Sequence, residues 1–203
     1  MSNIIGDNNT DSLLETTGAD GGLEVVGQQD QENTIEIKGD ATVEILGGEL
    51  NDKITTGAGD ATVFTGDGND MIVGGNGDDI FRGGDGDDVI RGGLGNDTIL
   101  GGDGNDVLRG GFGADVLKGG DGDDIFEFSA SEFDGTSLDE IVDFKDGGFE
   151  DSIKIFGVGV DGNVEYDSAT GIVSVNGNDA IDIGMDKDVS FEINEDNGTW
   201  DLV

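Results

Sequence analysis

The sequence predicts an all-β protein whose centre is a coil of short stacked strands. Glycine accounts for 40 of the 203 residues. A nine-residue unit repeats without a break over residues 47–127, and each unit places a bulky apolar residue at the same position. A three-residue strand between glycine-rich turns buries almost nothing alone, so units of this kind must stack on one another.

The repeated unit carries at least two glycines in most copies, an aspartate at position six and an apolar residue at position eight. The nine units begin at residues 47, 56, 65, 74, 83, 92, 101, 110 and 119. Ala61 replaces the aspartate in one unit, and the others carry Asp52, Asp70, Asp79, Asp88, Asp97, Asp106, Asp115 and Asp124. Position eight holds Ile54, Val63, Ile72, Phe81, Ile90, Ile99, Leu108, Leu117 and Phe126.

The spacing of the unit predicts how the coil is wound. Side chains alternate between the two faces of a strand, so position eight points inward while positions seven and nine point outward. Two successive units are the shortest stretch that can run out along one face and return along the other. We therefore expect a flattened coil with two sheets, and with position eight filling the space between them.

The composition excludes several classes of function. The chain has 47 acidic and 9 basic residues, a net charge of −38, and no cysteine or histidine. Disulfides, zinc sites and thiol or imidazole catalysis are therefore excluded. A polyanion repels nucleic acid and anionic membrane surfaces and attracts hard cations.

The sequence predicts neither a signal peptide nor a transmembrane helix. Residues 1–20 have no positive segment followed by an apolar core, so we expect no cleavable signal peptide. No apolar run approaches the roughly 18 residues of a transmembrane helix. Export, if it occurs, is expected by a route that needs no N-terminal signal.

The coil brings the aspartates into two stacks, one at each edge. Asp52, Asp70, Asp88, Asp106 and Asp124 share one edge, because they belong to every second unit. Stacked turns are about 4.8 Å apart, where two carboxylates repel by roughly 1 kcal/mol in water and by about 3–4 kcal/mol at an effective dielectric constant of 20. A divalent cation between each pair reverses the sign, so we expect that the coil does not form without metal. Only oxygen ligands are available, so the expected cation is a hard one.

The repeats resemble the RTX (repeats-in-toxin) calcium-binding nonapeptides over residues 47–127. The resemblance implies a right-handed parallel β-roll with Ca²⁺ bound between successive turns of one edge. It also implies the ligands of each ion. The carbonyls of positions two and four and the aspartate of one turn join the carbonyls of positions one and three and the aspartate of the next turn.

On this scheme the candidate ligands fall into groups by position. Position one supplies Gly83, Gly92, Gly101, Gly110 and Gly119; position two supplies Gly66, Gly75, Gly84, Gly93 and Gly102. Position three supplies Asp85, Leu94, Asp103, Phe112 and Asp121; position four supplies Gly68, Gly77, Gly86, Gly95 and Gly104. Position six supplies Asp70, Asp79, Asp88, Asp97, Asp106, Asp115 and Asp124.

We expect five strong calcium sites and up to two weaker ones. The strong sites lie between the aspartates 70/88, 88/106, 106/124, 79/97 and 97/115. The 52/70 site is weaker because Leu50 stands at the fourth position, and the 61/79 site is weaker because Ala61 has no carboxylate.

Two other interpretations of the acidic and glycine-rich segments are disfavoured. A disordered glycine-rich linker has no reason to keep an apolar residue at every ninth position. An EF-hand from Asp121 to Glu132 would place Ile125 at the fifth position and Phe126 where the loop requires glycine.

Residues 1–46 are predicted to form an acidic lead at the start of the roll. Short apolar clusters at 23–26, 34–37 and 42–46 recur at a spacing near nine, without the glycine and aspartate of a working turn. They fit either degenerate coils that cap the roll or a partly disordered lead.

Residues 128–203 are predicted to form a β cap. The segment 128–156 resembles the end of the calcium roll in serralysin-type proteases and in alginate epimerase repeat modules, and the residues that would cover the last coil are Ile141, Phe144, Ile153 and Ile155. A hairpin is predicted over 164–175, with strands at 180–183 and 191–193. Residues 195–203 resemble the uncleaved C-terminal signal of type I secretion, or form only a last strand. An alternative role for Asp139, Asp143, Asp146 and Asp151 is a catalytic acid pair.

These features predict a calcium-binding protein without catalytic activity, secreted or held at the surface of a bacterial cell, that folds when it meets extracellular Ca²⁺. A structural, surface or adhesion role is favoured. The alternatives are the secretion and folding module of an extracellular effector, or a polysaccharide-active enzyme that works through carboxylates. The expected partners are calcium ions and the type I secretion machinery. A surface polysaccharide or protein could bind the outward stripe of Val73, Val89, Val107, Ile125, Arg91 and Arg109, unless the flanking hairpins cover it.

Overall fold

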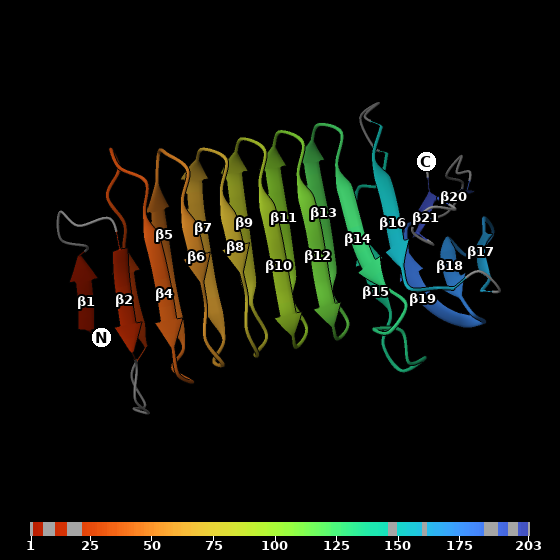
Figure 1. Cartoon of the computed structure of the whole chain (residues 1–203), viewed down its shortest axis with the longest axis horizontal. Coiled ribbons are helices and arrows are strands. Elements are labelled where there is room, and N and C mark those ends of the chain that lie inside the picture. The colour runs from red at the N-terminus through yellow and green to blue at the C-terminus, as the bar shows by residue number, and fades with distance from the viewer. Residues whose placement is uncertain are drawn as a thin grey trace.

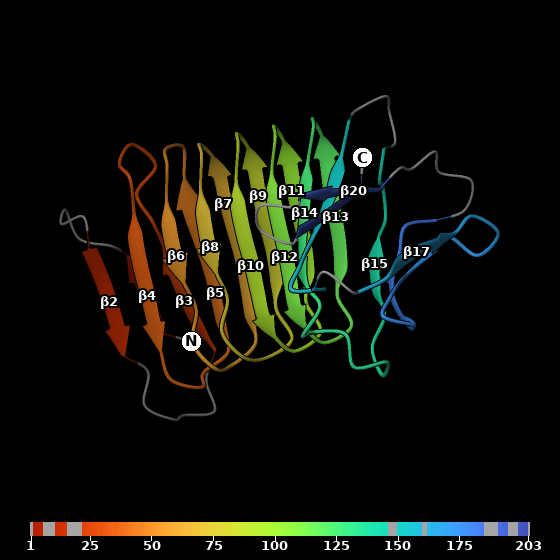
Figure 2. The ribbon, with the colours of Figure 1, turned by 45° about the vertical axis from the view of Figure 1, so that its right-hand side comes forward.

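Two facing sheets run the length of the molecule in the computed structural model (Figures 1 and 2), which describes residues 2–5, 11–15, 22–145, 150–159, 162–184, 191–194 and 199–202. From β1 to β16 successive strands alternate between the two sheets, as the coil predicted. The first sheet contains, in order, β1 (Ser2–Ile5), β3 (Leu23–Val26), β5 (Val43–Gly48), β7 (Ala61–Asp67), β9 (Ile80–Asp85), β11 (Thr98–Asp103), β13 (Val116–Asp121), β15 (Asp139–Ile141), β19 (Asn178–Asp182), β18 (Ile172–Val175) and β17 (Val164–Asp167).

The second sheet lies opposite and contains the other strands. They are, in order, β2 (Asp11–Glu15), β4 (Thr34–Lys38), β6 (Lys53–Thr55), β8 (Met71–Val73), β10 (Val89–Leu94), β12 (Val107–Phe112), β14 (Ile125–Ser129), β16 (Ser152–Phe156), β21 (Thr199–Leu202) and β20 (Phe191–Asn194).

Within the repeats, the register of the parallel strands is the predicted two units. Val89 of β10 pairs with Val107 of β12, and Thr98 of β11 pairs with Val116 of β13. All nine apolar residues at position eight are fully buried between the sheets. The prediction of an all-β parallel solenoid with position eight inside is confirmed.

Both flanks extend this solenoid. Residues 22–46 add β3, β4 and the start of β5, which bury Val25, Ile35 and Ile45 in the same core. After the repeats, β15 and β16 continue the two sheets in parallel. The expected cap residues Ile141, Phe144, Ile153 and Ile155 are buried.

The last strands turn antiparallel. β17 and β18 form the predicted hairpin, β19 follows it, and β20 pairs with β21 beside β16. The predicted secretion signal falls partly on residues 195–198 and 203, which lie outside the described residues. Within the described ranges no helix has the length and apolar character to span a membrane.

Candidate metal centre

The turns at each edge bring main-chain carbonyls toward the gap between neighbouring turns. Gly84 and Gly86, at positions two and four, have φ of +135° and +129°, a backbone conformation that residues with a side chain rarely adopt. A Cβ on Gly84 would lie 2.0 Å from the carbonyl oxygen of Gly66, and one on Gly86 would lie 2.1 Å from that of Gly68. The carbonyls of positions two and four therefore face the following turn.

The carbonyl of position one points in the opposite direction, back to the preceding turn. A Cβ on Gly83 would lie 1.9 Å from Asp88 Oδ2 and 2.8 Å from the carbonyl oxygen of Gly101. The same arrangement recurs at Gly92 and at Gly101. The position-one carbonyl of the next turn thus lies near the aspartate of the preceding turn, in the gap between the two. The first position is usually glycine because a Cβ there would collide with the aspartate of its own turn.

Position three contributes its carbonyl as well. The carbonyl oxygens of Asp85, Asp103, Phe112 and Asp121 accept the N–H of the position-four glycine in the preceding turn at 2.7–2.9 Å. They therefore face the preceding turn, as the ligand scheme requires, and each retains a second lone pair. The side chains of Leu94 and Phe112 are 47% and 49% exposed, in agreement with a position that uses only its main chain.

The position-six aspartates form two buried stacks, which we call the aspartate ladders. In each, Oδ1 of one aspartate accepts the N–H of the position-six residue in the preceding turn of the same edge: Asp88 accepts from Asp70 at 2.8 Å and Asp97 accepts from Asp79 at 2.9 Å. The second oxygen, Oδ2, is buried without a hydrogen-bond partner in Asp52, Asp70, Asp79, Asp88, Asp97, Asp106, Asp115 and Asp124. Buried carboxylate oxygens are costly unless a charge compensates them.

Burial and mutual repulsion change the acidity of the ladders. Desolvation, with a smaller contribution from the stacked neighbours, raises the pKa of Asp88, Asp97 and Asp124 to about 7. Burial likewise raises the pKa of Asp79, Asp106 and Asp115 to about 6. The negative charge on the ladders is therefore unfavourable in this fold without a cation.

The available oxygens fit Ca²⁺. Among the described residues no three carboxylates converge on one point, so a cation between turns would be held by two aspartates together with main-chain carbonyls. Ca²⁺ takes six to eight oxygen ligands in flexible geometry, whereas Mg²⁺ demands near-ideal octahedral geometry and keeps its waters.

Comparison with known families agrees with this chemistry. A family model described as the RTX calcium-binding nonapeptide repeat matches in four overlapping copies, over residues 46–81, 64–99, 73–108 and 100–130. Residues 46–130 are RTX calcium-binding repeats. No curated protein and no solved structure matches the chain. Residues 46–130 thus form a calcium-binding β-roll, and the resemblance of the C-terminal segment to serralysin-type proteases stays a prediction.

We call the gap between two stacked turns of one edge a level and name it by its two position-six residues. The levels 52/70 and 61/79, both expected to bind calcium more weakly, differ from each other in the structure. At 52/70, the carbonyl oxygen of Leu50 still approaches the next turn, 2.9 Å from where a Gly68 Cβ would lie. At 61/79, Ala61 is buried and donates its N–H to Asp79 Oδ1 at 2.7 Å, leaving one carboxylate. The first level therefore has the geometry of the others, and the second lacks one charged ligand.

A second ladder at position five was not recognised from the sequence. Oδ1 of Asn69 accepts the N–H of Asp87 at 3.1 Å, and Oδ1 of Asp87 accepts the N–H of Asn105 at 2.8 Å. This outer ladder is exposed, and its hydrogen bonds run in the opposite direction from those of the aspartate ladders. Its signal in the sequence is Asn or Asp at position five in eight of the nine units.

Two aspartates beyond the repeats extend the aspartate ladders. Asp139 Oδ1 accepts the N–H of Asp115 at 2.9 Å, and Asp151 Oδ1 accepts that of Asp124 at 3.0 Å. Asp143 accepts the N–H groups of Gly119 and Gly120, each at 3.0 Å. Asp139 and Asp151 therefore lie on different ladders. Asp146 lies outside the described residues.

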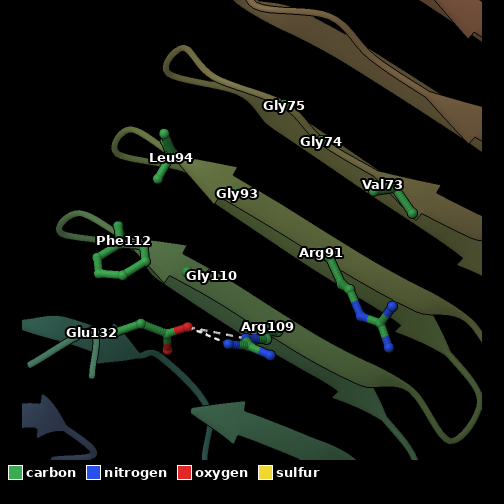
Figure 3. A pocket seen from close by; sticks show the side chains of 11 residues that line it. Val73, Gly74, Gly75, Arg91, Gly93, Leu94, Arg109, Gly110, Phe112 and Glu132 are labelled. Atoms are coloured by element: carbon green, nitrogen blue, oxygen red, sulfur yellow. Dashed lines mark hydrogen bonds and ion pairs between the residues drawn. The ribbon is translucent and has the colours of Figure 1, made fainter. Parts of the chain in front are cut away.

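The outer face of the second sheet carries a groove of about 320 Å³ (Figure 3). Val73, Arg91 and Arg109 line it from β8, β10 and β12, with Leu94 and Phe112 at one end. Glu132, from the segment after β14, forms an ion pair with Arg109 and accepts the Ser129 N–H at 2.8 Å. The cap therefore covers one end of the predicted outward stripe, and Glu132 serves the cap rather than an EF-hand.

Proposed function

We propose that this protein is exported unfolded and folds around Ca²⁺ outside the cell, where it serves as a structural, surface or adhesion protein without catalytic activity. The observation that carries the proposal is the set of eight buried aspartate Oδ2 atoms without partners, most of which lie at the gaps between turns. Because the fold needs a cation to compensate the charge of these buried oxygens, it is favoured only where Ca²⁺ is abundant.

The energies support a folding switch. In the cytosol free Ca²⁺ is scarce, and each stacked pair of carboxylates opposes folding by about 1–4 kcal/mol, depending on the local dielectric constant. At 100-fold excess over its Kd, each bound ion stabilises the folded state by about 2.7 kcal/mol. Five strong sites, with up to two weaker ones at 52/70 and 61/79, would replace the stabilisation that the chain lacks in disulfides.

Circular dichroism during a calcium titration tests this function. We expect a cooperative gain of β signal between micromolar and millimolar Ca²⁺, and none with Mg²⁺ at equal concentration. A β spectrum in chelator that Ca²⁺ leaves unchanged would show that the core alone holds the roll, and the export switch would have to be abandoned.

The groove on the second sheet supports a role at a surface. Among the described residues Arg91 has no ion-pair partner, whereas Arg109 is neutralised by Glu132. A surface partner bound there would present an anionic group to Arg91 and apolar atoms to Leu94 and Phe112. Arg91→Gln should release the protein from isolated cell envelopes, while Lys118→Gln, the same charge change on the first sheet, should not.

The alternative is that the roll is the secretion and folding module of an extracellular effector or of a polysaccharide-active enzyme. Loss of polysaccharide-degrading activity on mutation of one carboxylate in the C-terminal segment would favour this alternative. Secretion by a type I system would be tested by deleting residues 195–203 and measuring export.

A further inference from the structure

At one level of the roll a side-chain amide forms hydrogen bonds between two successive turns. The pairing of β4 with β6 places Thr34 beside Lys53 and Ile35 beside Ile54. Asn33 therefore stands above Asp52, at position six of the turn 28–33. It occupies the place that an aspartate holds in eight of the nine repeats, although the pair is one residue further apart along the chain than neighbours within the repeats.

The main chain of Asn33 behaves like that of the repeats. Its N–H donates to Asp52 Oδ1 at 2.7 Å, within the range of the hydrogen bonds between successive aspartates. The position is thus a true continuation of the aspartate ladder, and only the side chain differs.

The amide nitrogen of Asn33, which carries two hydrogens, lies within hydrogen-bond distance of three oxygens. Nδ2 lies 2.9 Å from Asp52 Oδ1 and 3.1 Å from the carbonyl oxygens of Gln28 and Gln31. The amide oxygen accepts the N–H of Gln28 at 2.8 Å. Exchanging the amide oxygen and nitrogen would bring oxygen against three acceptors and nitrogen against a donor, so the hydrogen-bond network fixes this orientation.

Two of these acceptors correspond to calcium ligands in the repeats. Gln31 stands at position four, whose carbonyl faces the next turn, and Asp52 supplies the carboxylate of the next turn. At the other levels these groups face a gap that a cation fits. Here the positive end of the amide dipole fills it, and the amide oxygen that could have served as a ligand is already bonded to Gln28.

The other edge ends by different means. Val43 pairs with Ala61, and both are buried at position six. Neither has a carboxylate, so nothing there requires compensation. The aspartate ladders therefore begin at Asp52 on one edge and at Asp79 on the other, and residues 22–46 contribute no position-six carboxylate to either.

We propose that Asn33 replaces a calcium ion at the first level of the roll: its amide joins the N-terminal coil to the first repeat without metal. This rests on the proposed function, since it presumes that ions occupy the levels below. The coil 22–46 is then held by hydrogen bonds and apolar packing, and the calcium sites of this edge begin only after it.

Asn33→Asp tests the proposal by restoring the carboxylate. In isothermal titration with Ca²⁺ the variant should bind one more ion per chain than the wild type, and its melting temperature should rise more steeply with calcium concentration. Asn51→Asp is the matched control, because Asn51 is an exposed member of the outer ladder whose Oδ1 accepts the Asn69 N–H at 2.8 Å. It adds the same charge one residue from Asp52 and should leave the number of ions unchanged.

Asn33→Ala provides a second measurement that does not depend on the aspartate variant folding. It should lower the melting temperature by the same amount at every saturating calcium concentration, with no change in stoichiometry. An unchanged ion count in Asn33→Asp, or a defect in Asn33→Ala that higher Ca²⁺ removes, would overturn the proposal. A wild-type chain that binds no Ca²⁺ would instead refute the proposed function.

Discussion

Replacing Asp88 by alanine tests the central claim that the aspartate ladders hold calcium. Asp88 lies in the middle of its ladder and takes part in two levels, 70/88 and 88/106. Its Oδ1 accepts the Asp70 N–H at 2.8 Å, and its own N–H donates to Asp106 Oδ1 at 2.8 Å. The substitution therefore removes a ligand from two ions and an acceptor from a buried N–H.

The expected loss can be worked out from these contacts. Two sites at 100-fold excess of Ca²⁺ contribute about 5 kcal/mol to the free energy of unfolding, and the unpaired Asp70 N–H adds about 1–3 kcal/mol. The variant should lose about 6–8 kcal/mol in Ca²⁺, enough to unfold a typical domain. In chelator, where the wild type is expected not to fold, the variant and the wild type should not differ.

Urea denaturation at saturating Ca²⁺ and a calcium titration of the same samples provide the assay. Asp87→Ala is the control, because Asp87 is the exposed neighbour that accepts only the Asn105 N–H and Nδ2. It should lose about 0.5–1.5 kcal/mol and keep every ion, whereas Asp88→Ala should lose two ions. Equal losses in the two variants, or an unchanged ion count in Asp88→Ala, would refute the assignment of the ladder as the metal site.

Four further predictions follow from the turns. In chelator, acidification from pH 8 to pH 5 should increase the β signal in circular dichroism. The pKa of Asp88 and Asp97 is about 7 in the fold against 3.8 in the unfolded chain, so the cost of their buried charge to folding is full above pH 7 and declines toward pH 4. A decrease of the β signal would contradict these pKa shifts. Calcium affinity should fall over the same range, because protons compete for the carboxylates. Gly84→Ala should destabilise the protein by more than about 2 kcal/mol, since its Cβ would lie 2.0 Å from the Gly66 oxygen, whereas Gly157→Ala, at φ +76° with nothing within 4 Å, should cost less in the same urea assay. Phe112→Ala should leave the calcium stoichiometry unchanged, because position three offers only its carbonyl; loss of an ion would show that the ring supports the turn.

The sequence was sufficient for the solenoid and for most of the candidate site because the fold repeats strictly. A constant period of nine places position eight inside and stacks Asp70 on Asp88 without any knowledge of distant contacts. Where the period breaks, the same reasoning fails. Asp139 lies 24 residues after Asp115, and Asp151 lies 27 residues after Asp124, so the intervening loops conceal their place on the ladders. Only the local pattern of aspartate followed two residues later by isoleucine could have indicated it.

The alternation of strands between two sheets restricts how such a chain can change its length. Removing residues 92–109, one full coil, would leave every remaining side chain on its own sheet and edge, so the roll would only become shorter. Removing residues 92–100, a single unit, would transfer everything that follows to the opposite sheet. Glu132, which meets Arg109 on the second sheet, would then come to the first. Insertions and deletions within the repeats are therefore expected in pairs of units, so that the number of units changes by two at a time.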